Sequence, residues 1–154
     1  MFKIRKRSWQ SRSGTKTAWF VDYRDGGGNR RGKQFDRKKD AEAWAAIAIN
    51  EVRLGTHTPD STSVTVAQAA DQWLDSVRTS DREPTTIAAY DQHVRLHIVP
   101  VCGRIKLSQL TAPKVRKILD GWLANLSRPM ATRVFRSFKA ILTEAQARGL
   151  VAQN

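Results

Sequence analysis

The sequence predicts an α+β protein in which a three-stranded antiparallel sheet packed on one helix precedes an all-α unit of four helices. Three observations lead to this fold class. Aromatic and β-branched residues concentrate in short runs before residue 36. Apolar residues recur at helical spacing over 37–54 and again after residue 64. The polar stretch "THTPDSTS" separates the two parts. We therefore predict a β-β-β-α domain over 1–55, a linker over 56–64 and a helical domain over 65–154.

Three runs supply the sheet, namely "FKIRKRSW", "AWFVDYR" and "RRGKQF". "SRSGTKT" is predicted as a loop between the first two, and "DGGGN" as a turn that tolerates positive φ between the last two. Strand alternation puts Trp19, Val21 and Tyr23 on one face. Asp36 is the predicted N-cap of the following helix, and Gly55 its C-terminal stop. This helix covers one face of the sheet, so the opposite face carries the excess Lys and Arg.

The helical part begins at a capping box formed by Thr65 and Gln68. The second helix runs through "TTIAAYDQHVRLHI" and is predicted to break at Pro100 and Gly103. Thr111 caps the third helix, and the fourth covers "RPMATRVFRSFKAILTEAQAR". The predicted inward stripes of the four helices are Val66, Ala70, Trp73, Leu74 and Val77; Ile87, Tyr90, Val94 and Ile98; Val115, Ile118, Leu119 and Trp122; and Met130, Val134, Phe138, Ile141, Leu142 and Ala145.

A net charge of +13 is the strongest global signal in the composition. Residues 1–55 contain 14 Lys and Arg against 6 Asp and Glu, and the remainder is also basic. A fold does not require such an excess, whereas a polyanionic partner explains it, and nucleic acid is the leading one. No apolar run approaches the roughly 18 residues of a membrane span, and no signal-peptide core follows the basic N-terminus. We expect a soluble intracellular protein without a membrane partner.

The stretch "GGNRRGKQ" matches a phosphate-binding loop until Gln34 stands where the Mg²⁺-binding hydroxyl belongs. The strand before it is half polar, and a strand rather than a helix follows Lys33. We interpret this stretch as a β-hairpin and predict no nucleotide binding.

Other chemistry finds little support in the residues. His93 and His97 have the spacing of zinc helices, but Val94 replaces the expected Glu. Cys102 is the only cysteine and is predicted to be a small buried hydrophobe. No catalytic triad or acidic cluster is recognisable. We predict no catalytic residues, no metal and no cofactor, and hence no enzymatic activity in this chain.

Candidate DNA contacts fall into two sets. A sheet face can lie in a major groove, where Arg and Gln read base edges. By alternation, the predicted contacts of the sheet are Lys3, Arg5, Arg7, Phe20, Arg24, Arg30 and Gln34. The predicted contacts of the helical part are Thr85, Thr86, Ala89 and His93 on an outward face of the second helix, with Arg128, Thr132, Arg133, Arg136 and Lys139 on the fourth.

The run "WFVDYRDGGGNRRGKQFDRKKDAEAW" resembles the N-terminal arm-binding domain of phage-type tyrosine integrases. The resemblance is carried by Trp19, Val21, Tyr23, Arg24, Asp25, Phe35, Lys38, Lys39, Ala41, Glu42 and Trp44. "TVAQAADQWL" and "TTIAAYDQHVRLHIVPVCGRIKLSQLTAPKVRKIL" resemble the core-binding domain of the same family. The specific part is carried by Arg95 to Pro100, Gly103, Leu107, Leu110 and Thr111. Together the two matches cover nearly the whole chain in the family's order.

The resemblance implies sequence-specific binding of double-stranded DNA during phage integration and excision. The sheet domain would bind arm-type sites and the helical domain core-type sites. It also implies that the catalytic domain lies outside this chain, which would bind DNA without cutting it. Other integrase protomers and a host DNA-bending protein are the implied partners, in the cytoplasm of a bacterial host. Two alternatives remain: a stand-alone DNA-binding regulator or architectural protein built from the same modules, and an RNA-binding basic protein.

Overall fold

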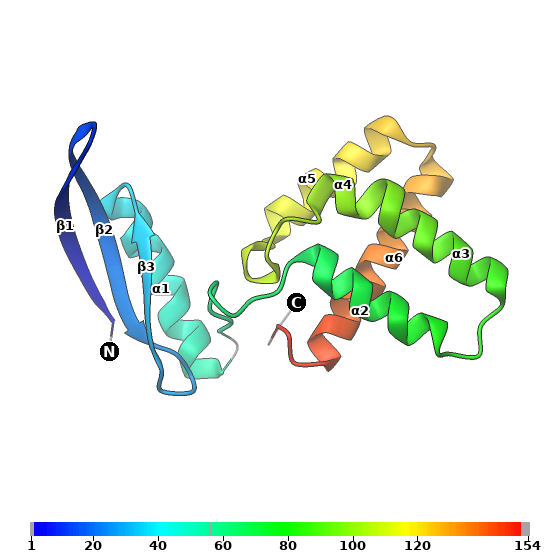
Figure 1. The fold of residues 1–154 in the computed structure, drawn as a ribbon, viewed down its shortest axis with the longest axis horizontal. Coiled ribbons are helices and arrows are strands. Elements are labelled where there is room, and N and C mark those ends of the chain that lie inside the picture. The colour runs from blue at the N-terminus through cyan, green and yellow to red at the C-terminus, as the bar shows by residue number, and fades with distance from the viewer. Residues whose placement is uncertain (1, 56, 152–154) are drawn as a thin grey trace. The chain divides into compact units, whose positions relative to one another are not determined.

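The computed structural model describes residues 2–55 and 57–151, which form two compact units over 1–59 and 60–154 (Figure 1). The division falls within the stretch 56–64 that the sequence predicts as a linker. Among the described residues, no helix has both the length and the apolar character needed to cross a membrane. The combination of a three-stranded antiparallel sheet with helices confirms the predicted α+β class.

The sheet consists of β1 (Lys3–Ser11), β2 (Gly14–Arg24) and β3 (Arg30–Phe35) in the order β1-β2-β3. Both neighbouring pairs are antiparallel. The first two strands extend further than predicted, because most of the expected loop "SRSGTKT" is paired. Only Arg12 and Ser13 make the turn, and Gly14 follows with φ of 108°, a backbone conformation that glycine adopts without a Cβ clash.

Helix α1 (Lys38–Leu54) packs on one face of this sheet. The core there is small: Val21 with Ala41 and Ala45, surrounded by partly buried aromatic side chains. The predicted N-cap at Asp36 is wrong, since Arg37 occupies that position and makes no side-chain cap. Gly55 ends the helix with φ of 70°, as its predicted role as a stop requires.

Over residues 60–151, the helical unit contains four main helical segments. Thr65 and Gln68 form the predicted capping box at the start of the first. The predicted break at Pro100 is wrong, because a π-helical turn carries the second segment through to Cys102, whereas Gly103 caps its end as predicted. Such a turn changes the backbone hydrogen-bond pattern just before the residue that lacks an N–H. Gly103 ends the segment where an added Cβ would lie 2.6 Å from the Val99 carbonyl oxygen. The elements are α2 (Val66–Arg78), α3 (Pro84–His93), the π-turn η1 (Val94–Ile98), α4 (Val99–Cys102), the 3₁₀ turn η2 (Leu107–Gln109), α5 (Ala112–Asn125) and α6 (Arg128–Ala147).

The core of the helical unit is much larger than that of the sheet unit. Phe138, Ile141 and Val134 on α6 are fully buried, and Val66 and Ile98 pack with them. These positions belong to the inward stripes that the sequence predicts. Burial of each such side chain contributes roughly 1.5–3 kcal/mol before entropy is subtracted. The helical unit therefore supplies a rigid framework for the faces of α3 and α6.

Candidate nucleic-acid interface

The strand register gathers all seven predicted sheet contacts on one face. Side chains of directly opposite residues in antiparallel strands share a face. Arg5 lies opposite Phe20, which lies opposite Gln34. Arg24 lies opposite Arg30 in the second pair. The remaining members of the same face are Lys3 opposite Asp22 and Arg7 opposite Ala18. Because α1 packs on the Val21 face, this face is the uncovered one.

A stacked pair organises the middle of the uncovered face. The Arg7 guanidinium lies 4.9 Å from the centre of the Phe20 ring, a favourable cation–π arrangement. Beside it, Arg7, Trp9, Phe20 and Gln34 line an open hollow of about 480 Å³. Trp9 is absent from the predicted contacts. Alternation along β1 already places Trp9 on the same face as Arg5 and Arg7, opposite the covered face that carries Phe2 and Ile4.

Asp22 is the acidic residue of this face. Its Oδ2 accepts a hydrogen bond of 2.8 Å from Nε of Arg5, and Nη2 of Arg5 also contacts it. Both side chains are partly exposed, so water screens the pair. The pair restricts the position of the Arg5 guanidinium on the surface.

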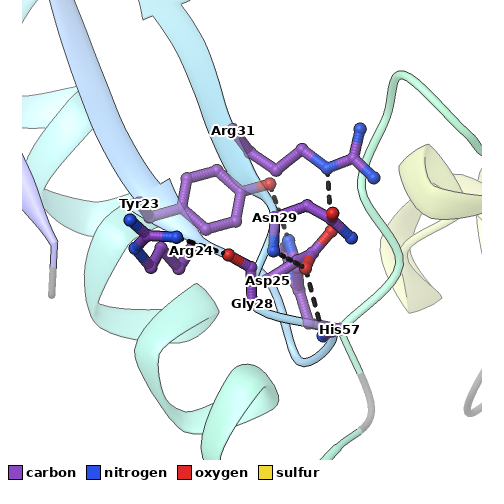
Figure 2. Close-up of polar contacts among 8 residues, drawn as sticks. Tyr23, Arg24, Asp25, Gly28, Asn29, Arg31 and His57 are labelled. Atoms are coloured by element: carbon purple, nitrogen blue, oxygen red, sulfur yellow. Dashed lines mark hydrogen bonds and ion pairs between the residues drawn. The ribbon is translucent and has the colours of Figure 1, made fainter.

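In the glycine-rich turn between β2 and β3, backbone N–H groups bind the side-chain carboxylate of a residue in the turn itself (Figure 2). The Asp25 carboxylate accepts hydrogen bonds from the N–H groups of Gly27, at 3.0 Å, and Asn29, at 2.9 Å. Arg31 Nε donates to the same carboxylate at 2.8 Å, and this bond is the main reason that the pKa of Asp25 lies below its ordinary value. The N–H groups that would surround a phosphate in a nucleotide loop are therefore used internally. The hairpin interpretation of this stretch is confirmed by the strand pairing.

His57 anchors the chain where it leaves α1. Its Nε2 lies 2.8 Å from the Tyr23 hydroxyl, and its Nδ1 lies 2.9 Å from a Glu51 carboxylate oxygen. The His57 side chain is almost fully buried, and Figure 2 shows it directed at Tyr23. The sheet unit thus extends beyond Gly55 through specific side-chain bonds.

A groove between α3 and α6 collects six of the nine predicted contacts of the helical unit. Its volume is about 420 Å³. Arg133 and Arg136 come from α6, and Ser137 and Tyr90 contribute to the lining. The predicted contacts that line it are Thr85, Thr86, Ala89, His93, Arg133 and Arg136. Residues more than 40 positions apart are thereby brought to one site.

The predicted outward position of His93 is wrong. The side chain is buried, and its Nδ1 lies 2.9 Å from the Ser137 hydroxyl oxygen on α6. Burial lowers its pKa, and the nearby His97 and Arg133 lower it further. His93 is therefore a largely neutral part of the groove floor near pH 7, whereas the arginines carry the charge.

The other three predicted contacts lie apart from this groove. The Thr132 hydroxyl donates to the Arg128 carbonyl oxygen at 2.9 Å within α6. Lys139 borders a different, largely apolar hollow of about 490 Å³, lined also by Leu119 of α5 and Phe135. Thr132 and Lys139 share α6 with Arg136, but of these three residues only Arg136 lines the groove between α3 and α6.

Metal and thiol chemistry find no site in the described part of the chain. Over residues 2–55 and 57–151, no group of three or more His, Cys, Asp and Glu residues could bind a metal ion. Cys102 is buried, its Sγ donates to the Ile98 carbonyl oxygen at 3.3 Å, and burial raises its thiol pKa to about 12. The prediction of a small buried hydrophobe is confirmed.

Comparison with known proteins shows similarity to phage integrases. Residues 65–123 match the phage integrase N-terminal SAM-like domain. The chain is 28% identical over 164 residues to the integrase of Mycobacterium phage L5 and 27% identical over 165 residues to that of Mycobacterium phage D29. Each match covers 97% of this chain and 42% of the relative. The chain thus spans less than half the length of these integrases.

Solved structures agree on the fold. A lambda integrase dimer bound to a COC′ core site superposes with a TM-score of 0.56 at 18% identity, covering 96% of this chain and 42% of the other. A lambda integrase tetramer bound to a Holliday junction gives 0.54 at 19% identity, covering 94% and 43%. The resemblance to phage tyrosine integrases is confirmed: nearly the whole chain is similar to a part of two phage integrases, and a phage-integrase domain matches residues 65–123.

Proposed function

We propose that this chain is the DNA-binding N-terminal part of a phage integrase, in which the sheet unit binds arm-type attachment sites and the helical unit binds core-type sites. The observation that carries the proposal is the strand register that gathers six Lys, Arg and Gln contacts and Phe20 on one uncovered face. The similarity to phage integrases, and to lambda integrase chains in structures with a Holliday junction and a core site, supports the same role.

On the sheet face, we assign phosphate binding and base recognition to different residues. Lys3, Arg24 and Arg30 are exposed cations that bind phosphates and release counterions. Gln34 and Arg7 flank Phe20 in the middle of the face. Their donors and acceptors match the bidentate patterns of adenine and guanine edges. In this proposal, the exposed cations set affinity and the central residues read sequence.

In the helical unit, the groove between α3 and α6 offers two arginines above a neutral floor. Arg133 and Arg136 line it together with the hydroxyls of Thr85 and Thr86. The four side chains can all donate hydrogen bonds to phosphate oxygens. The bond between His93 and Ser137 fixes α3 against α6 and so sets the spacing of these donors.

The rest of the proposed role concerns the whole integrase. Strand cleavage belongs, in this proposal, to the parts of such proteins that the matches to this chain do not cover. Other integrase protomers and a host DNA-bending protein are the proposed partners in the bacterial cytoplasm. Exposed Ile47 and Leu54 on α1 offer an apolar surface for such contacts.

A pair of matched substitutions tests the division between the units. Arg30→Ala should weaken binding to an arm-site duplex and reduce its salt slope by about 0.9, because one phosphate contact is lost. Arg136→Ala should do the same for a core-site duplex only. Gel shifts across a salt series on both duplexes measure the effects, with Lys39→Ala on α1 as a charge-matched control. Equal weakening on both duplexes by either variant contradicts the division.

A further inference from the structure

The β1–β2 hairpin extends past the three-stranded part of the sheet as a two-stranded ribbon. Strand β3 pairs only with residues 19–24 of β2. The opposed stretches 7–11 and 14–18 therefore have no third strand beside them. Figure 1 shows this blue hairpin reaching beyond the end of β3. At about 3.4 Å per residue, five residues per strand make an extension of roughly 17 Å.

The ribbon carries positive charge without any acidic residue nearby in the sequence. Residues 1–21 contain six Lys and Arg and no Asp or Glu. Arg12 lies in the turn, and Lys16 lies directly opposite Trp9. Both cations are exposed, and neither belongs to the predicted contact set. A polyanion is the partner that this charge fits.

Strand alternation makes the ribbon a continuation of the proposed arm-site face. Trp9 lies two residues after Arg7 on β1, and Lys16 lies four residues before Phe20 on β2. Their side chains therefore leave the same side of the sheet as those of Arg7 and Phe20. Trp9 is 39% exposed and borders the hollow that contains Phe20 and Gln34. An exposed tryptophan at the junction between two basic surfaces can pack on sugar or base edges.

An isolated two-stranded ribbon is marginally stable in water, and this one is joined mainly by polar cross-strand pairs. Gln10 Nε2 donates to the Thr15 hydroxyl at 3.0 Å, and the Ser8 and Thr17 hydroxyl oxygens lie 3.4 Å apart. Among the described residues, the apolar cluster of the sheet unit includes no residue of 7–11 or 14–18. A DNA surface beside the ribbon would supply the contacts that packing does not.

We propose that this ribbon, with Trp9, Arg12 and Lys16, is a second DNA-contacting element that lengthens the footprint of the sheet along the duplex. The proposal rests on the proposed arm-site role of the sheet face. The major groove is wide enough for a two-stranded ribbon. Trp9 packs at the groove edge, and Arg12 and Lys16 bind phosphates past the end of the three-stranded sheet.

Charge removal tests the phosphate contacts. The double variant Arg12→Gln/Lys16→Gln should lower the salt slope for a short random-sequence duplex by about 1.8, at about 0.9 per phosphate. The control Lys39→Gln/Arg53→Gln removes the same charge from α1 and should change the slope much less. Equal changes in the two variants would show only an effect of net charge and would overturn the proposal.

Shortening the ribbon tests its geometry. Deleting Trp9–Gln10 together with Thr15–Lys16 removes two residues from each strand and keeps the alternation of the rest. On a duplex selected for binding by the parent chain, hydroxyl-radical protection should retreat at one end and persist over the remainder. An unchanged footprint overturns the proposal while leaving the arm-site role intact. Absence of duplex binding by the parent chain would instead contradict the proposed function itself.

Discussion

The two units carry their positively charged side chains on different structures: a strand face in the sheet unit and a groove between two helices in the helical unit. In the sheet unit, charge lies on an uncovered strand face whose opposite side rests on the small core around Val21. In the helical unit, Arg133 and Arg136 line a groove whose floor is a buried histidine–serine pair, above a large core. The first surface follows from alternation within each strand and from the register that pairs the three strands. The second depends on how two helices pack.

The largest expected effect concerns the core of the helical unit. Phe138→Ala should lower the free energy of unfolding of the helical unit by about 3–5 kcal/mol, because a fully buried aromatic ring is lost. Phe35→Ala, at a partly buried position of the sheet unit, should cost less. Urea unfolding of the two variants, followed by circular dichroism, measures both. Equal losses would contradict the contrast between a large core and a small one.

A second prediction concerns the acid on the sheet face. Asp22→Ala removes the partner of Arg5 and one negative charge. Affinity for random-sequence duplex should rise, and the salt slope should steepen by about 0.9 if the freed arginine binds a phosphate. The preference for a selected site over random sequence should fall, since Arg5 loses its fixed position. Competition binding measures this ratio, and an unchanged ratio means that the pair does not contribute to selectivity.

A smaller effect is a pH dependence of stability that arises from His93 in the groove. The pKa of His93 is lowered in the folded protein by burial first and then by His97 and Arg133. The unfolded chain, with the ordinary value of 6.5, therefore binds this proton more readily. Stability from this group is complete above pH 6.5 and is lost as pH falls toward the lowered folded value. Thermal unfolding on both sides of that pH should show a dependence that His93→Gln reduces.

The smallest expected effect is a null result at the glycine-rich turn. Asp25 already accepts the N–H groups of Gly27 and Asn29, so the turn offers a nucleotide no phosphate cradle. Isothermal titration with ATP and Mg²⁺ should show no saturable binding for the parent chain or for Lys33→Ala. Saturable binding that Lys33→Ala abolishes would overturn the hairpin interpretation.

Several features followed from the sequence alone. Alternation in "AWFVDYR" separates Val21 from Phe20 and Arg24, and this pattern survives in the observed register. The Thr65 capping box is a contact between residues three positions apart. The charge excess needs no fold at all to be seen. Each of these depends on residues that are neighbours along the chain, so the sequence displays it directly.

Other features were decided by tertiary structure. Helical spacing put His93 on an outward face, but packing on α6 buried it against Ser137, 44 positions away. Lys139 shares a helix with Arg136, yet α5 places it beside a different hollow. The π-turn that carries the second helix past Pro100 buries Val94 and Ile98 in the core of the helical unit. Periodicity specifies which residues share a face of an element, whereas only the packing of distant elements determines what that face meets.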